Sequence, residues 1–167
     1  MTMFENENPI MPMADDGGGG TTIIPSVGVR PHNLNYNSSA YDFDNFAEGQ
    51  CTWHCYGRAR EVMNKTLTFT STGNNHAANW WNKVTNCTKS QTPRANSIAV
   101  WDDGGYGHVA YVEAVSGNKI YFTEANWGTD NDKNELDPDD GVVDVLTVSA
   151  FKSRNGGTHI LSGYLYL

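Results

Sequence analysis

The stretch that decides the fold is Gly49-Gln50-Cys51-Thr52-Trp53-His54-Cys55-Tyr56-Gly57-Arg58-Ala59-Arg60. It predicts a helix over about residues 50–64, because apolar side chains recur at helical spacing: Cys51, Cys55, Ala59, Val62 and Met63. Gly49 permits a sharp turn just before this helix. Cys51 is then expected in the first turn, where unpaired N–H groups and the helix dipole favour a reactive thiolate. The alternative is that Cys51 is a small buried core residue.

Length and composition indicate one α+β domain. A chain of 167 residues can bury a core without cross-links. Only 18% of residues are charged, while aromatic residues reach 11% and glycines number 17, a mixture typical of a β-rich or α+β domain with many turns. The net charge of −8 argues against a nucleic-acid partner, because phosphate binding requires clustered Lys and Arg. No apolar run reaches the roughly 18 residues of a membrane span, so no membrane insertion is expected.

The three cysteines, Cys51, Cys55 and Cys87, make neither a disulfide framework nor a zinc motif. Their odd number fits one reactive thiol and two structural ones. A Cys55–Cys87 disulfide is the alternative to two free thiols.

The chain divides into a leader, residues 1–30, and a folded domain, residues 31–167. The leader contains four consecutive glycines and is expected to be flexible. It lacks the basic and apolar regions of a secretory signal.

Beyond the cysteine helix, a second helix is predicted over about residues 76–84, capped by Asn74 or Asn75. Its Trp80 and Trp81 are expected to close the core, and a sugar-stacking platform is the alternative. The pattern then changes to period two, which predicts antiparallel strands over residues 97–101, 107–115, 119–127, 142–148 and 160–166. Residues 130–141 are acidic and rich in turn formers, and are expected to form a solvated loop.

The predicted hairpin between residues 107 and 127 contains candidate catalytic side chains. A three-residue loop, Ser116-Gly117-Asn118, would place His108 opposite Asn126 and diagonal to Glu124 on one strand face. A loop of two or four residues would put His108 and Glu124 on opposite faces. A histidine held by a carboxylate or amide is typical of a general base. If the helix start packs across this end, the Cys51 thiolate and the imidazole meet as an ion pair. The alternative is a polar corner in which His108 merely bonds to Glu124.

Four segments of the sequence resemble a known protein family. Gly49-Gln50-Cys51-Thr52-Trp53, Asn79-Trp80-Trp81, Gly107 to Glu113 and Glu124-Ala125-Asn126-Trp127 resemble the CHAP family of cysteine, histidine-dependent amidohydrolases/peptidases. The resemblance implies a papain-like fold, with N-terminal helices packed on an antiparallel β-sheet, over residues 31–167. It implies a cell-wall hydrolase that needs no cofactor.

The resemblance also implies a role for each matching residue. Cys51 is similar to the family nucleophile, His108 to its base and Glu124 to the residue that orients the base. Asn126 matches a further polar helper, and Gln50 a contributor to the oxyanion hole. Trp53, Trp101 and Trp127 are expected to contact substrate.

Calcium is a further possibility that the resemblance raises. Some family members bind calcium through aspartates upstream of the cysteine, and Asp42 and Asp44 lie at matching positions. The aspartate that would follow the nucleophile is replaced by Trp53.

The function expected from this resemblance is hydrolysis of a peptidoglycan amide or peptide bond, as an N-acetylmuramoyl-L-alanine amidase or a D,L-endopeptidase. Action at the bacterial cell wall is expected, by a phage-encoded protein or one exported without a classical signal. A glycan-binding or virion structural module that uses Trp80, Trp81, Trp101 and Trp127 is the first alternative. A cysteine amidase acting on a small soluble amide is the second.

Overall fold

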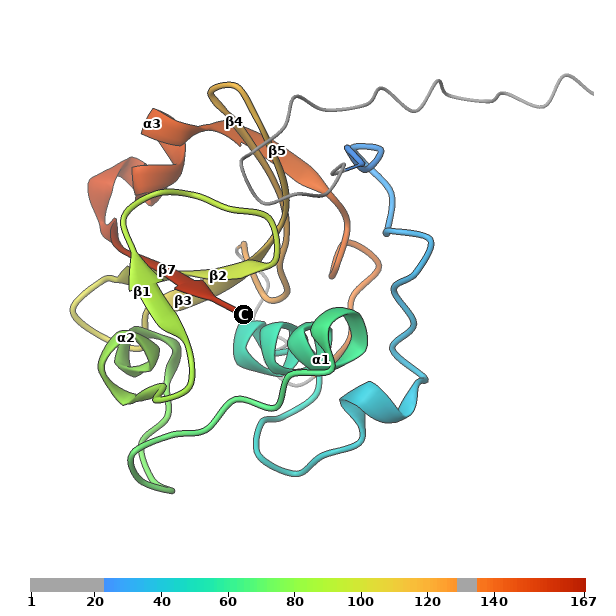
Figure 1. The fold of residues 1–167 in the computed structure, drawn as a ribbon, viewed down its shortest axis with the longest axis vertical. Coiled ribbons are helices and arrows are strands. Elements are labelled where there is room, and N and C mark those ends of the chain that lie inside the picture. The colour runs from blue at the N-terminus through green and yellow to red at the C-terminus, as the bar shows by residue number, and fades with distance from the viewer. Residues whose placement is uncertain (1–22, 129–134) are drawn as a thin grey trace, which may run out of the picture.

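The segments with period-two patterning form one antiparallel sheet (Figure 1). The computed structural model describes residues 23–128 and 135–167. In this part of the chain the sheet has the strand order β1-β7-β2-β3-β4-β5, and β6 pairs with β7. The strands are β1 (Thr88–Ser90), β2 (Ser97–Asp102), β3 (His108–Ser116), β4 (Lys119–Thr123), β5 (Asp144–Thr147), β6 (Ser153–Arg154) and β7 (His159–Tyr166). The predicted α+β class is confirmed.

The described helices are short apart from the one that carries the cysteines. That helix, α1 (Cys51–Met63), matches the predicted range to within one residue at each end. The second predicted helix divides into a 3₁₀ turn, η2 (Ala77–Asn79), and α2 (Trp80–Lys83). The predicted Asn74 or Asn75 cap is wrong, because His76 occupies that position and makes no side-chain cap. The others are η1 (Ser39–Tyr41), α3 (Val148–Lys152) and η3 (Asn155–Gly157).

Alternating side chains of the central strands pack into two separate apolar cores. One core joins α1, η2 and α2 to one face of the sheet, and the other joins α3 to the opposite face. The α1-side core includes Cys55, Ala59, Trp80, Ile98, Val100, Val109 and Tyr111. The α3-side core includes Ala99, Trp101, Ala110, Val112, Ile120, Phe122, Phe151 and Tyr164. The sheet is therefore packed against helices on both faces.

The hairpin loop is shorter than predicted, but a β-bulge compensates for the difference in register. The loop has two residues rather than three, because Ser116 pairs with Lys119. Carried on unbroken, that register would pair Tyr111 with Glu124. Instead the register shifts between Val112 and Ala114, so Tyr111 pairs with Thr123. This β-bulge inserts one residue and restores the register that a three-residue loop would have produced.

The residue inserted at the bulge is Glu113, and it binds a buried arginine. Arg58 of α1 donates from Nε to Glu113 Oε1 at 2.9 Å and from an Nη atom to Oε2 at 3.0 Å. The same guanidinium reaches Glu61 at 2.6 Å. Arg58 is 1% exposed, so these carboxylates must offset the free-energy cost of burying its charge. The bulge is thus tied to α1, the helix that carries Cys51.

The folded domain begins before residue 31. Gly28 donates its N–H to the Val143 carbonyl at 2.9 Å, and Val143 donates to Val29 at 3.0 Å. Arg30 donates to the Asp140 carbonyl at 2.8 Å. Residues 28–30 therefore belong with the domain rather than with the predicted leader, whose residues 1–22 lie outside the described part of the chain.

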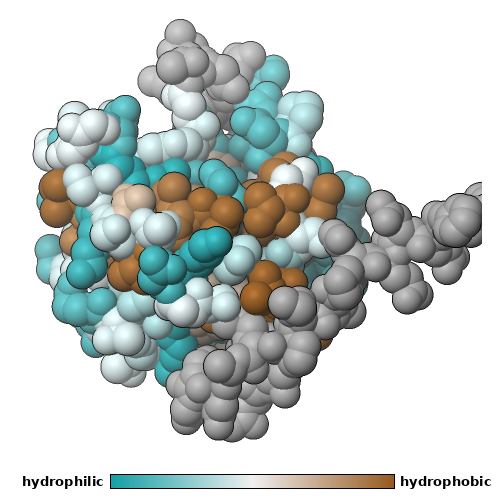
Figure 2. Space-filling view, turned by 90° about the horizontal axis from the view of Figure 1, so that it is seen from above, coloured by the Kyte–Doolittle hydropathy of each residue, from teal (hydrophilic) through white to brown (hydrophobic). Residues whose placement is uncertain are grey.

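Apolar surface is limited to patches between polar residues on the face drawn in Figure 2. Three exposed apolar side chains lie in the N-terminal segment: Ile23, Val27 and Val29. Within the described residues, no helix has the length and apolar character needed to cross a bilayer.

Glu113→Ala should lower the free energy of unfolding by about 3 kcal/mol, because it leaves the buried Arg58 charge with Glu61 as its remaining carboxylate. Urea denaturation measures this loss. Glu48→Ala, an exposed carboxylate in the loop before α1, is the matched control and should change stability by less than about 0.5 kcal/mol. Equal stability of the two variants would show that the bulge does not depend on this pair.

Candidate active site

Cys51 is the first residue of α1, as predicted, and the chain before it makes a tight turn. Gly49 has φ of +81°, and Gln50 is extended at the N-cap position. A Cβ at position 49 would overlap the backbone of Glu135, so glycine is required there on two grounds. All three thiols are free, so the alternative of a Cys55–Cys87 disulfide is not realised.

Cys51 and His108 come from opposite faces of the sheet and meet at its end. Cys51 packs with the α1-side core, whereas His108 opens β3 opposite Trp101, a member of the α3-side core. Burial alone would lower the pKa of His108, but the charge of Cys51 and its hydrogen bond, together with Glu124, raise that pKa to about 9. The imidazole is therefore held as an imidazolium beside Cys51 at neutral pH.

Glu124 holds the far side of the same ring. His108 Nε2 lies 2.7 Å from Glu124 Oε2, which leaves Nδ1 as the nitrogen that faces Cys51. The predicted contact between the histidine and this carboxylate is thus present. Glu124 directly follows β4, in the register that the bulge restores.

Arg154 binds Glu124 as well, and this contact was not predicted from the sequence. Its two terminal nitrogens donate to Glu124 Oε2 at 2.7 Å and to Oε1 at 2.8 Å. Burial would raise the pKa of Glu124, but hydrogen bonds from Arg154 and His108 outweigh it and lower that pKa to about 2. A single arginine in a polar segment, 30 residues beyond its partner, carries no sequence signal that would have revealed it.

Asn126 lies beside Gln50. Its Nδ2 donates to Gln50 Oε1 at 3.0 Å. The residue adopts a left-handed backbone with φ of +53°, and its N–H donates to Asp140 Oδ1 at 2.9 Å. This backbone also ends the predicted strand at Thr123 rather than at Trp127. Asn126 therefore fixes the Gln50 carboxamide next to the start of α1.

Two of the three tryptophans expected at the substrate are buried. Trp53 is 4% exposed and packs on Tyr36 and Tyr41. Trp101 is 0% exposed and donates from Nε1 to the Phe151 carbonyl at 2.7 Å. Their burial corrects the expectation of a substrate-stacking role. Trp127 is partly exposed, and its ring lies 4.6 Å from that of His108.

A second histidine lies one turn along α1, in a different electrostatic setting. His54 is fully buried, and its Nε2 lies 2.9 Å from the Thr123 hydroxyl, which itself donates to Glu113. Tyr36 donates to His54 Nδ1 at 2.7 Å. Burial, followed by the charge of Arg58, lowers the pKa of His54 to about 3. His54 is therefore neutral and structural, whereas His108 is charged.

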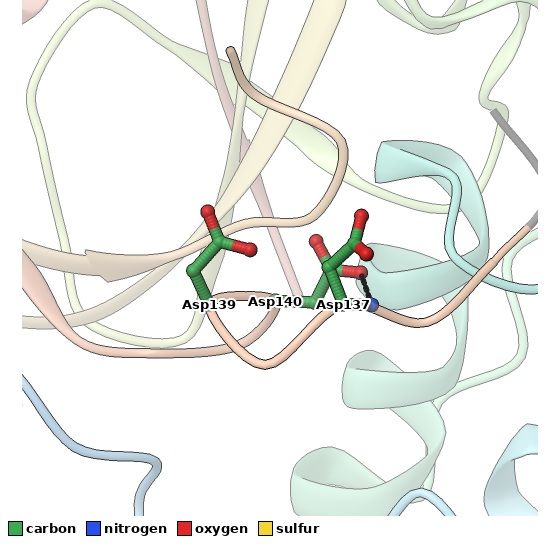
Figure 3. A group of neighbouring side chains, drawn as sticks. All are labelled: Asp137, Asp139 and Asp140. Carbon is green, nitrogen blue, oxygen red and sulfur yellow. Dashed lines mark hydrogen bonds between the residues drawn. The ribbon is translucent and has the colours of Figure 1, made fainter. Parts of the chain in front are cut away.

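Figure 3 shows the one group of three or more potential metal-ligand side chains found in the described residues: Asp137, Asp139 and Asp140. Both carboxylate oxygens of Asp140 already accept backbone N–H groups, from Asn126 and from Asp137. This end of the predicted acidic loop thus supports Asn126, while residues 129–134 lie outside the described part.

Asp42 and Asp44 are exposed and belong to no such group in the described residues. The expectation that Asp42 and Asp44 could bind calcium stays a prediction.

A model of the CHAP domain family matches residues 41–126, half of the chain, so the chain belongs to the CHAP family. Among curated proteins, "Probable autolysin SsaALP" of Staphylococcus aureus is 34% identical over 125 residues, which cover 72% of this chain and 43% of that protein. "Staphylococcal secretory antigen ssaA2" of the same organism is 34% identical over 133 residues, covering 78% and 43%. The chain thus spans less than half the length of these relatives.

The fold also matches a solved structure. The crystal structure of Ly7917 superposes with a TM-score of 0.51 at 16% sequence identity, over 72% of this chain and 53% of the other. At that identity the likeness concerns the fold alone. It agrees with the predicted α+β architecture.

The charged state of His108 can be measured without a substrate. In the intact domain, ¹⁵N NMR should show the ring protonated up to about pH 9. In Cys51→Ala the midpoint should fall, because the thiolate that favours the imidazolium is removed. A midpoint that stays near 9 in Cys51→Ala would show that the two groups are not paired. His54 should remain neutral down to about pH 3 in both proteins and serves as the internal control.

Proposed function

We propose that this domain is a cysteine hydrolase that cleaves an amide or peptide bond of peptidoglycan. The observation that carries the proposal is the hydrogen-bonded pair of Cys51 and His108 at the start of α1, with Glu124 on the other ring nitrogen. A thiol, an imidazole and an orienting carboxylate in this order form an acyl-transfer site.

The proposed reaction has two steps. The Cys51 thiolate attacks the scissile carbonyl carbon, and the His108 imidazolium donates its Nδ1 proton to the leaving amine. The C–N bond breaks and a thioester forms. The now neutral imidazole takes a proton from water and becomes an imidazolium, and the hydroxide attacks the thioester. The C–S bond breaks, the carboxylic acid leaves, and the thiolate is regenerated beside the imidazolium.

The negative charge that develops on the carbonyl oxygen requires donors. The N–H of Cys51, at the start of α1, and the carboxamide of Gln50 are proposed to supply them. The bond from Asn126 Nδ2 fixes Gln50 by its oxygen, which directs the Gln50 amino group away from Asn126. Asn126 is therefore proposed to position Gln50, while Glu124 orients His108.

The choice of peptidoglycan as substrate is supported by family membership and by a relative named as an autolysin. Two relatives with "autolysin" and "secretory antigen" in their names also support action at the cell wall. The muramoyl–L-alanine amide and peptide bonds of the stem or cross-bridge are the candidate bonds. Burial of Trp80 and Trp101 weakens the glycan-binding alternative, because it leaves two of its four rings, Trp81 and Trp127, partly exposed.

The test is digestion of purified walls from several Gram-positive species by the full chain, with products read by mass spectrometry. Release of peptides free of amino sugar identifies an amidase, and new amino termini within peptides identify an endopeptidase. Cys51→Ala should abolish both while the circular dichroism spectrum is kept. Cys87→Ser, a half-buried thiol outside the site, should retain activity. Hydrolysis by Cys51→Ala, or no product from the unmodified chain, would reject the proposal.

Gln50→Ala should lower kcat by roughly 10²–10³-fold with little change in KM, as expected for an oxyanion donor. Asn126→Asp should also lower kcat, since it replaces the donor to Gln50 with an acceptor while retaining a residue that tolerates the left-handed backbone. Kinetics on a released wall fragment measure both variants. An Asn126→Asp enzyme with normal kcat would show that Gln50 needs no such support.

A further inference from the structure

Arg154 lies at the end of a chain of four interacting groups. The order is Cys51, the His108 imidazolium, the Glu124 carboxylate and the Arg154 guanidinium. His108 and Arg154 are 3% and 7% exposed. Without Arg154 the Glu124 carboxylate would lose the cation that binds both of its oxygens, which is unfavourable for a charge held largely away from water.

The guanidinium is held in one orientation by aromatic rings as well as by Glu124. Its central carbon lies 3.8 Å from the Trp127 ring centroid and 5.0 Å from that of Trp101. Trp127 in turn contacts the His108 ring. A planar fork stacked on rings fixes the plane of the carboxylate that it binds, which an ammonium group would not do.

The segment that precedes Arg154 is held in place by hydrogen bonds near both ends of α3. Thr147 caps α3 by accepting the Ala150 N–H at 3.2 Å, and Trp101 binds the Phe151 carbonyl near the other end. Arg154 then pairs with His159 of β7. This segment lies outside residues 41–126, the range that the family model matches.

We propose that Arg154 is a positioning residue that keeps the buried Glu124 ionised and in the plane that holds the His108 imidazolium. The inference rests on the proposed function, because it assigns Arg154 a part in the same reaction. Arg154 binds Glu124, which binds His108, so its effect on Cys51 passes through these two residues. Loss of Arg154 would let the Glu124 carboxyl take up a proton at mildly acidic pH, and the His108 imidazolium would then lose the carboxylate that stabilises it.

The experiment measures alkylation of Cys51 in the full chain by iodoacetamide, followed by mass spectrometry between pH 4 and 9. This reagent reports the thiolate and needs no wall substrate. In Arg154→Gln the acid limb of the rate profile should move to higher pH. Removal of the adjacent cation raises the Glu124 carboxyl pKa by about 1–3 units, and a protonated Glu124 no longer stabilises the His108 imidazolium that favours the thiolate. Arg94→Gln is the matched control. Its guanidinium also stacks on a ring, that of Tyr166, at the surface, and its profile should match the unmodified protein.

Two further variants separate positioning from a general loss of structure. Combining Arg154→Gln with Glu124→Gln should alkylate no more slowly than Glu124→Gln alone, because both act through one carboxylate. Arg154→Lys keeps the charge and loses the fork, so its acid limb should lie between those of the unmodified protein and Glu124→Gln. This variant carries the test if Arg154→Gln does not fold.

An acid limb unchanged in folded Arg154→Gln would overturn the inference, as would rate losses that multiply in the double variant. If Arg154→Lys carries the test, a profile identical to the unmodified protein would overturn it. If the acid limb moves as expected but the unmodified chain releases no wall products, the proposed function fails and the assignment of Arg154 to the charge chain stands.

Discussion

The ion pair between Arg58 and Glu113 governs much of this structure. It ties a helix to a strand by two nearly buried charged groups, and the strand must bulge to deliver the carboxylate. Because side chains alternate along a strand, that one extra residue decides which face every later residue of the hairpin presents. Glu124 reaches His108 as a result. A contact on the α1 side of the sheet thus sets the geometry on the other side.

Two buried histidines, His54 of α1 and His108 of β3, show how environment gives one residue type different charge states. His54 is surrounded by neutral hydroxyls and a nearby arginine, and it stays uncharged. His108 lies between a thiol and a carboxylate, and it is charged. The difference lies in the partners, since both rings are buried. Opposed protonation states in two histidines that influence each other electrostatically are typical of a site in which the fold controls proton position.

Much of this could be predicted from the sequence, and the rest shows what local patterns omit. The helix start at Cys51 follows from apolar spacing and one glycine, which are local signals. The contact between His108 and Glu124 was predicted from a loop length that is wrong, and it holds because the unforeseen bulge at Glu113 compensates. Arg154 could not be predicted, since its meaning depends on packing with strands distant in sequence. Trp53 and Trp101 were expected at the surface because an aromatic side chain suits both a binding face and a core.

The pairing of residues 28–30 with Val143, together with the late position of Arg154, has a practical consequence for engineering. The minimal unit that could be moved into a chimeric protein is longer than the range that defines the family. A graft that ended after Asn126 would leave Glu124 without its cation and would remove β5 and β7 from the sheet. The transferable module therefore extends from about residue 28 through β7.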